Sequence, residues 1–291
     1  MSALRKMLDR RNDNDDPLWM GVLNITPDSF SDGGEYFDRD AALRRVDELV
    51  AEGAQLIDIG GESTRPRSAP VPAEEQIRRT TDAIVHAVSR GVIVSIDTTD
   101  AQVAEQALRL GASVVNDVSC LRDGDALARV AARQGAALII MHAREPMSKM
   151  QGFSVCDDDA YQDVIQDVRN EWQQAAKRAM QAGLDAQDVF FDPGLGFNKN
   201  ARHSIELVAR LHEFRSLGHG IVVGPSRKSF LAARVQSTPN RRIGGTIAAC
   251  LACAARGASV LRIHDVLDVR QAFAVARDIG QDGVRDWRGS P

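Results

Sequence analysis

Two residues near the end of the chain, Arg262 and His264, carry the clearest signal for chemistry. They lie two positions apart in the apolar run VLRIH, so their side chains leave the same face of a strand. A guanidinium fork and an imidazole donor together suit phosphate oxygens. Asn24 ends another apolar run, and its amide oxygen is a hard ligand for Mg²⁺. These side chains predict a site for a polyphosphate with a metal ion, although the run alone is equally consistent with a structural His264–Asp265 pair.

A second set of polar residues suits a planar heterocycle. Asp97 and Asp192 each end an apolar run, Asn116 lies in a third run, and Lys228 follows a fourth. Buried carboxylates are costly unless they are paired or hydrogen-bonded, and an amino-pyrimidinone edge would offer them parallel N–H donors. Bonding of these side chains to one another is the alternative. Four such residues at one rim favour a binding site.

The segment GPSRKSF, residues 224–230, offers a third cluster of donors. Gly224 allows the backbone to approach a ligand closely, and the residues after Pro225 supply side-chain donors: Ser226, Arg227, Lys228 and Ser229. The segment lacks the spacing of a P-loop, so by itself it is a weak signal. Its place after the seventh apolar run is the usual anion-binding neighbourhood of a barrel.

The elements that must position these residues are eight short apolar runs, each ending in a polar or charged residue. Continuous apolar runs are typical of parallel strands that are buried on both faces, and amphipathic, helix-like stretches follow most of them. Eight such units predict an α/β fold, a single-domain (β/α)8 TIM barrel with its active site at the carboxyl ends of the strands. The runs end at Asn24, Glu62, Asp97, Asp117, His142, Asp192, Lys228 and His264.

The domain organisation follows from the absence of any Pro/Gly/Ser-rich linker. We expect residues 1–16 to form a flexible N-terminal tail and residues 17–291 to form the barrel. Three connections are longer than a barrel requires, and long loops at strand ends are often binding lids. They are Thr26–Asp38, Ser63–Pro72 and Glu145–Asp157.

Composition excludes several classes of partner. The chain has 291 residues, is 44% hydrophobic and carries a net charge of −4, so it lacks the electrostatic footprint of a nucleic-acid-binding protein. No apolar stretch is long enough to span a membrane, and the charged N-terminus does not resemble a secretory signal. Cys250 and Cys253 lie in an Ala-rich, helix-like segment without a second ligand pair, which favours core packing. We expect a cytoplasmic protein.

Seven segments, taken in order, resemble dihydropteroate synthases. They are GVLNITPDSFSDGG, DIGGESTRP, SIDT, VNDVS, DPGLGF, SRKSF and LRIHDV, and the similarity extends from about residue 20 to residue 279. The resemblance implies that 6-hydroxymethyl-7,8-dihydropterin pyrophosphate is condensed with p-aminobenzoate to give dihydropteroate and pyrophosphate, in folate synthesis. It also implies Mg²⁺ as cofactor, small-molecule substrates as partners, a pterinylmethyl transferase of the class that sulfonamides target, and a homodimer.

The resemblance assigns roles to individual residues. The pterin-binding positions of the family match Asp97, Asn116, Asp192 and Lys228. The pyrophosphate contacts match Arg65, Arg262 and His264, with Asn24 at the pyrophosphate and the Mg²⁺. The p-aminobenzoate pocket matches Phe30, Thr64, Pro66, Phe197 and Ser229. The resemblance implies that the residues acting in catalysis are Arg65, Asp97, Lys228, Arg262 and His264.

The implied reaction is a dissociative substitution in which electrostatics supplies the main catalytic effect. Cleavage of the C–O bond to pyrophosphate leaves positive charge on the pterin methylene, and cationic groups would stabilise the departing anion. Two alternatives stay open: a paralogue that binds pterin without turnover, and a methyltransferase that uses methyltetrahydrofolate. The sequence departs from the family at three positions where Gly, or Gly or Ala, is usual, namely Arg67, Cys120 and Asn198.

Overall fold

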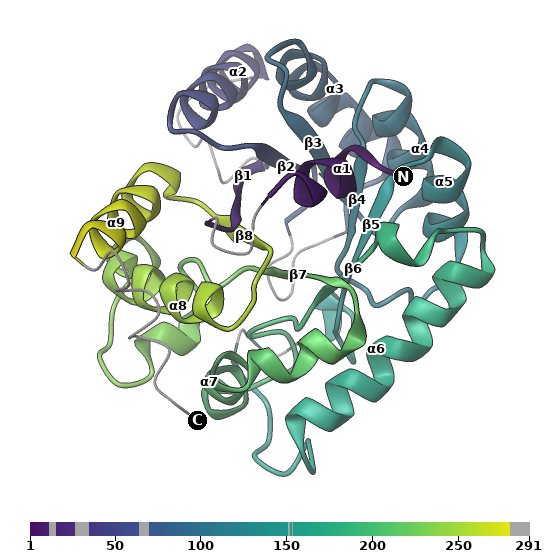
Figure 1. Ribbon diagram of the computed structural model, residues 1–291. Helices are drawn as coiled ribbons and strands as arrows, with labels where there is room; N and C mark the ends of the chain where they lie inside the picture. Colours follow the sequence, from purple (N-terminus) through teal and green to yellow (C-terminus); the bar gives the residue numbers. More distant parts are fainter. Residues whose placement is uncertain (12–15, 27–34, 64–69, 151, 153, 280–291) are drawn as a thin grey trace.

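The computed structural model describes residues 1–11, 16–26, 35–63, 70–150, 152 and 154–279. Its strands form one closed barrel in which each strand is parallel to its neighbours and the first pairs with the last (Figure 1). This confirms the predicted (β/α)8 barrel. The strands are β1 (Leu18–Asn24), β2 (Leu56–Gly60), β3 (Ile93–Asp97), β4 (Val114–Asp117), β5 (Ala137–Met141), β6 (Val189–Asp192), β7 (Gly220–Val223) and β8 (Val260–Ile263).

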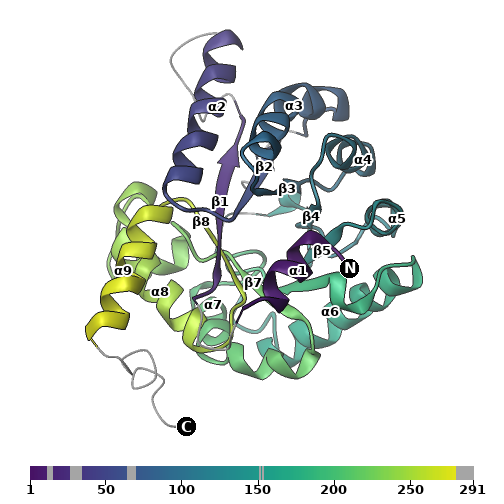
Figure 2. The same ribbon diagram turned by 45° about the horizontal axis from the view of Figure 1, so that its top comes forward.

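Helices surround the ring of strands (Figure 2). They are α2 (Glu35–Ala51), α3 (Ala73–Ser89), α4 (Ala101–Arg109), α5 (Ala126–Gln134), α6 (Val164–Gln181), α7 (Ala201–Ala209), α8 (Ile243–Ala255) and α9 (Val266–Ile279). Short 3₁₀ helices occupy several connections: η2 (Met147–Lys149), η3 (Ala186–Asp188), η4 (Leu211–Leu217), η5 (Ser229–Ala232) and η6 (Pro239–Arg241). In the described part of the chain, every helix is too short or too polar to cross a membrane.

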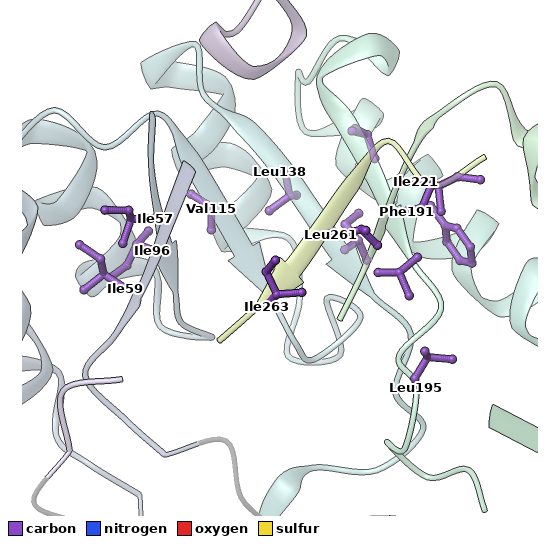
Figure 3. Packing of buried hydrophobic residues seen from close by; sticks show 14 of the residues in the cluster. Ile57, Ile59, Ile96, Val115, Leu138, Phe191, Leu195, Ile221, Leu261 and Ile263 are labelled. Carbon is purple, nitrogen blue, oxygen red and sulfur yellow. The ribbon is translucent and has the colours of Figure 1, made fainter. Parts of the chain in front are cut away.

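Strand residues alternate between two apolar regions. One set, which includes Ile57, Ile59 and Val115, packs outward against the helices and forms the largest core cluster (Figure 3). The other set, which includes Leu56 and Val114, points into the barrel and forms a separate cluster. Because the side-chain period of a strand is two, residues that continue the inward set toward the carboxyl ends must also face the barrel axis.

The N-terminal segment corrects the prediction of a flexible tail over residues 1–16, which is wrong for the described residues 1–11. Helix α1 (Ala3–Asp9) lies over the ring of strands (Figure 1). Its Leu4 is fully buried in the inward-facing cluster with Leu18 and Met20. The backbone N–H of Ser2 donates to Asp188 Oδ1 at 2.9 Å. The apolar interior of the barrel would otherwise meet water at this end, and α1 covers it.

The three long connections coincide only partly with described residues. Helix α2 already begins at Glu35, before the expected end of the first connection, and residues 27–34 and 64–69 lie outside the described residues. The third connection contains η2. The third connection is followed by α6, whose start is capped by Asp163, which accepts hydrogen bonds from two backbone N–H groups.

Replacing Leu4 by Ala tests whether α1 is part of the folded barrel. Leu4 is 0% exposed, so we expect the free energy of unfolding to fall by about 2–5 kcal/mol, measured by urea denaturation. The matched control is Leu267→Ala on α9, where the side chain is 59% exposed and a change of about 0.5 kcal/mol or less is expected. Equal stability of wild type and Leu4→Ala would show that α1 does not contribute.

Candidate active site

Strand register brings three of the predicted residues to one level of the barrel. Asn24 pairs with Gly60, Gly60 with Asp97, and Asp97 with Asn116 across β1 to β4. A Cβ atom at Gly60 would lie 3.4 Å from the Cβ of Asp97 and 3.6 Å from Oδ1 of Asn24. A methyl group at this position would therefore contact both side chains at the carboxyl end of the strands.

Arg262 links Asp97 to Asp58, a buried residue that was not predicted from the sequence. Its Nε donates to Asp58 Oδ2 at 2.6 Å, and its second guanidinium nitrogen donates to Asp97 Oδ2 at 2.8 Å. The Asn116 amide also donates to Asp58 Oδ2, at 3.0 Å. Asp58 is fully buried. It thus orients the guanidinium and the amide from below. A charged residue in the middle of the apolar run LIDIG was the signal that could have revealed it.

The carboxylates of Asp58 and Asp97 each leave one oxygen without a hydrogen bond in the described part of the chain. Among the described residues, Asp58 Oδ1 and Asp97 Oδ1 are buried side-chain atoms without a hydrogen-bond partner. Burial and then the charge of Asp58 raise the pKa of Asp97 to about 7, against the opposing effect of Arg262. A ligand that offers N–H donors to Asp97 would satisfy the free oxygen and favour the ionised form.

Asp192 and Lys228 lie across the mouth from this cluster. Asp192 accepts a hydrogen bond from the Gly194 backbone N–H at 2.7 Å. Burial raises the pKa of Asp192, and the Lys228 ammonium opposes that shift. Burial likewise lowers the pKa of Lys228 to about 8, and Asp192 opposes that shift. The pair therefore places a carboxylate and an ammonium group near each other at the barrel mouth.

An apolar wall adjoins these polar groups. Lys228 Nζ donates to the Leu195 carbonyl at 2.7 Å and lies 4.6 Å from the centre of the Phe197 ring. Phe197 is 5% exposed and belongs to a small cluster at the barrel mouth. The other members are Val118, Met141, Ala143 and Met150. Flat heterocycles and benzene rings bind against such surfaces, with polar groups fixing their orientation.

The residues after β8 do not form the structural His264–Asp265 pair that the sequence left open. Asp265 does not pair with His264; it accepts from Arg227, whose Nε lies 3.0 Å from Asp265 Oδ2. The His264 ring instead meets the Ser226 hydroxyl, with Nδ1 and Oγ 3.0 Å apart. Burial, and then the Arg262 charge, lower the pKa of His264 to about 3. The imidazole is therefore neutral at pH 7 and contributes a hydrogen bond rather than a charge.

The donors of the GPSRKSF segment thus have different roles. Arg227 is used in the structural pair with Asp265, and Ser226 supports the His264 ring. Ser229 Oγ donates to Ser154 Oγ at 2.7 Å. Only Lys228 combines contact with the apolar wall and proximity to the Asp192 carboxylate.

The remaining predicted residues lie outside the described residues, namely Phe30, Thr64, Arg65 and Pro66, together with the departure at Arg67. The backbone explains why glycine is usual at the positions of the two other departures. Cys120 has φ +60° and Asn198 has φ +49°, the left-handed region that favours glycine. Asn tolerates this region better than most residues, and Asn198 Oδ1 accepts the backbone N–H groups of Arg144 and Glu145 at 2.9 and 3.0 Å.

The donor set for a metal is sparse. Across the described residues there is no group of three or more His, Cys, Asp or Glu side chains that could hold a metal ion. The half-buried Asn24 amide oxygen is the predicted ligand, and it lies 3.6 Å from where a Cβ atom at Gly60 would be. One protein oxygen fits Mg²⁺ that takes its other ligands from water and from substrate phosphates, which is how this ion is commonly bound.

Comparison with known proteins agrees with this geometry. The pterin-binding enzyme family matches residues 20–264. The chain belongs to the pterin-binding enzyme family. Within this family it is 40% identical to the dihydropteroate synthase of Synechocystis over 260 residues, which cover 88% of each chain. It is also 39% identical over 264 residues to a probable bifunctional folylpolyglutamate synthase/dihydropteroate synthase of Haloferax volcanii, covering 90% of this chain and 30% of that longer protein.

A solved structure of the pterin-binding family supports the same assignment. The dihydropteroate synthase of Clostridium difficile, determined in the presence of pteroic acid, superposes with a TM-score of 0.83 at 35% identity. The alignment covers 91% of this chain and 97% of that chain. The family resemblance and the (β/α)8 fold inferred from sequence are both confirmed.

Replacing Asp58 by Asn tests the electrostatic link between the two buried carboxylates. Because the charge of Asp58 contributes to the raised pKa of Asp97, we expect the Asp97 carboxyl to titrate at lower pH in Asp58→Asn. The measurement is the ¹³C chemical shift of the carboxyl carbons against pH, with Asp97→Asn identifying the signal. Asp82→Asn, at an exposed surface ion pair, serves as control. An unchanged or higher Asp97 pKa would contradict the proposed link.

Proposed function

We propose that this chain is a pterinylmethyl transferase that joins 6-hydroxymethyl-7,8-dihydropterin pyrophosphate to p-aminobenzoate, forming dihydropteroate and pyrophosphate. The observation that carries the proposal is the buried cluster of Asp58, Asp97, Asn116 and Arg262, in which Asp97 Oδ1 has no partner among the described residues. Such a carboxylate suits the parallel N–H donors of an amino-pyrimidinone edge. Membership of the pterin-binding family points to the same heterocycle.

The pterin edge is read by acceptors and donors on opposite sides of the mouth. Asp97 and Asn116 face it from β3 and β4, while Asp192 and Lys228 face it from β6 and the segment after β7. Positive charge develops on the pterin when its methylene loses pyrophosphate. Ionised Asp97 and Asp192 favour that state over the neutral ground state, because both carboxylates are removed from water.

The leaving group is stabilised by cations and hydrogen-bond donors. The C–O bond breaks, and its electron pair departs with pyrophosphate. Arg262 reaches the mouth from β8, and the neutral His264 ring offers a donor beside it. Arg65 is assigned to the same anion through the family resemblance. When bound, Mg²⁺ supplies further charge neutralisation of the phosphate oxygens, and Asn24 would hold it from the protein side.

The acceptor amine completes the substitution. The p-aminobenzoate ring packs against the Phe197 wall, near Lys228 and Ser229. The amine lone pair forms the new C–N bond to the pterin methylene, and the amine proton is released to solvent or to pyrophosphate. Phe30, Thr64 and Pro66 are assigned to this pocket by the family resemblance. The reaction needs no strong base, since the carbon that is attacked already carries positive charge.

The proposal also covers the oligomeric state of the protein and its cellular compartment. Helix α8 is rich in small apolar residues, and its Ile247 and Leu251 are only partly buried. We infer a homodimer, and sedimentation equilibrium of the purified chain measures its mass. We also infer that the protein acts in the cytoplasm.

The decisive experiment incubates the purified chain with both substrates and Mg²⁺. Pyrophosphate and dihydropteroate should appear in equal amounts, and omission of p-aminobenzoate should abolish dihydropteroate. Calorimetric binding of the pterin pyrophosphate without product would support a paralogue that does not turn over. Methyl transfer from methyltetrahydrofolate to a corrinoid acceptor, without pyrophosphate release, would support a methyltransferase.

Replacing Arg262 by Ala should lower turnover much more than pterin affinity. We expect kcat to fall by roughly 10²–10³-fold, the usual effect of removing a group that stabilises charge in the transition state. The dissociation constant of the pterin substrate is measured in parallel by calorimetry. Arg109→Ala, which removes a guanidinium 62% exposed on α4, is the control. Unchanged turnover in Arg262→Ala would refute the role.

Removal of divalent metal should stop the reaction reversibly. A chelator should abolish product formation, and added Mg²⁺ should restore it. In Asn24→Ala the Mg²⁺ concentration for half-maximal rate should rise by about tenfold, as for loss of a single ligand or its support. The binding of pterin that lacks pyrophosphate should be unchanged. Full activity in the chelator would contradict the requirement for Mg²⁺.

A further inference from the structure

Lys199, in the loop that follows β6, is a buried lysine outside the groups used so far, and burial lowers its pKa to about 7 against the opposing charge of Asp192. Its side chain has 0% exposure. Its Nζ lies 2.9 Å from His142 Nδ1, 3.2 Å from the His142 carbonyl and 3.0 Å from the Phe197 carbonyl. Three acceptors match the three N–H donors of an ammonium group. The side chain therefore ties the loop after β6 to the residue that follows β5.

The surroundings of Lys199 fix the proton on the neighbouring histidine. Burial, and then the Lys199 charge, lower the pKa of His142 to about 4, so the ring is neutral. With Nδ1 accepting from Lys199, Nε2 donates to Glu171 Oε2 at 2.9 Å. Arg144 holds the same carboxylate through Nε at 3.0 Å. Every polar group in this hydrogen-bond network thus has a complementary partner, and the network ends at Glu171 on helix α6.

The loop from Pro193 to Asn200 needs such external contacts. Gly194, Gly196 and Asn198 have φ values of +66°, +80° and +49°, so the loop adopts no regular structure. A Cβ atom at Gly194 would lie 2.1 Å from the His142 carbonyl oxygen, which shows how closely the loop approaches the end of β5. The Tyr161 hydroxyl donates to the Asn198 carbonyl at 3.0 Å. Side-chain contacts thus add to the backbone hydrogen bond from the Phe197 N–H to the Gly194 carbonyl, at 3.1 Å, in defining the shape of the loop.

Two lysines hold this loop from opposite sides. Lys228 donates to the Leu195 carbonyl at 2.7 Å from the side of the site. Lys199 donates to the Phe197 carbonyl from the buried side. The Phe197 ring packs with Val118 and Met141 and lies 4.6 Å from the Lys228 ammonium. A shift of the Phe197 carbonyl would therefore move the ring and disturb its contact with Lys228.

We propose that Lys199 is a positioning residue for the p-aminobenzoate end of the site, holding the Phe197 carbonyl against the end of β5 and so fixing the place of the Phe197 ring. The inference rests on the proposed synthase function. Because the side chain of Lys199 is enclosed, it acts on the ligand through the Phe197 carbonyl rather than by direct contact. The polar edge of the site keeps its own hydrogen bonds, from the Asn116 amide to Asp58 and from the Gly194 N–H to Asp192.

Steady-state kinetics of Lys199→Met tests the proposal. Methionine has a similar length but no donor, so the Phe197 carbonyl loses its anchor. We expect KM for p-aminobenzoate to rise by about tenfold or more, because small displacements of positioning groups have effects of this size or larger. The kcat should change by less than about threefold and the dissociation constant of the pterin substrate by less than about twofold. Lys177→Met, at an exposed position on α6, is the matched control.

A double-mutant cycle with Phe197→Ala separates positioning from general stability. If Lys199 acts through the ring, Lys199→Met should have little further effect on KM once the ring is absent. Circular dichroism checks that each variant is folded. Should Lys199→Met be unfolded, Lys199→Gln replaces it with the same expected split, since its shorter side chain reaches the carbonyl less well. His142→Gln, which leaves the Phe197 contact in place, should keep KM within about twofold of wild type.

The outcomes distinguish this inference from the proposed function. Absence of dihydropteroate from the wild-type enzyme would refute the function itself. An active wild type with unchanged KM in the folded Lys199 variant would overturn the inference alone. Equal losses in pterin affinity and p-aminobenzoate KM, or an additive effect with Phe197→Ala, would also overturn it, because they would indicate a structural role for the buried lysine.

Discussion

The structure of the barrel mouth depends on the placement of one guanidinium group between two buried carboxylates. Arg262 on β8 meets Asp58 on β2 and Asp97 on β3, and none of the three could be buried alone without a large desolvation cost. The pairing requires the barrel to be closed, since β8 comes beside these strands only through β1. It leaves one oxygen of each carboxylate without a partner in the described structure. The same contact thus stabilises the fold and prepares the site.

Arg262, Asp58 and Asp97 form a polar layer that divides the interior of the barrel along its axis. Below it, the inward-facing strand residues form an apolar cluster that α1 closes with Leu4. Above it, Asp97, Asn116 and Asp192 face the mouth with little exposure to water. Charges in such a position interact more strongly than they would in solution. An apolar floor therefore supports a site whose chemistry is mainly electrostatic.

The loops after β5 and β6 add the apolar side of the site. Left-handed backbone at Gly194, Gly196 and Asn198 carries Phe197 to the mouth. The lysines on either side of the loop hold its carbonyl groups, and burial lowers the pKa of Lys228 to about 8 while Asp192 opposes this. Rigid strands thus set the polar edge, and side-chain hydrogen bonds set the aromatic wall. Lys228 links the two parts, because it contacts the Phe197 ring and interacts with the Asp192 carboxylate.

The sequence by itself determined the barrel and the convergence of its polar strand ends. Apolar runs define the strands, and parallel strands must place their carboxyl ends on one side, so Asn24, Asp97, Asn116 and Asp192 had to meet there. Period-two alternation also predicted that Arg262 and His264 share one face of their strand. The pattern of residues along each strand could not show which inward-facing side chains contact one another across the barrel. The pairing of Asp58 with Arg262, the docking of α1 and the burial of Lys199 were decided only by the tertiary structure, because each joins segments that are distant along the chain or distinguishes a buried charge from an exposed one.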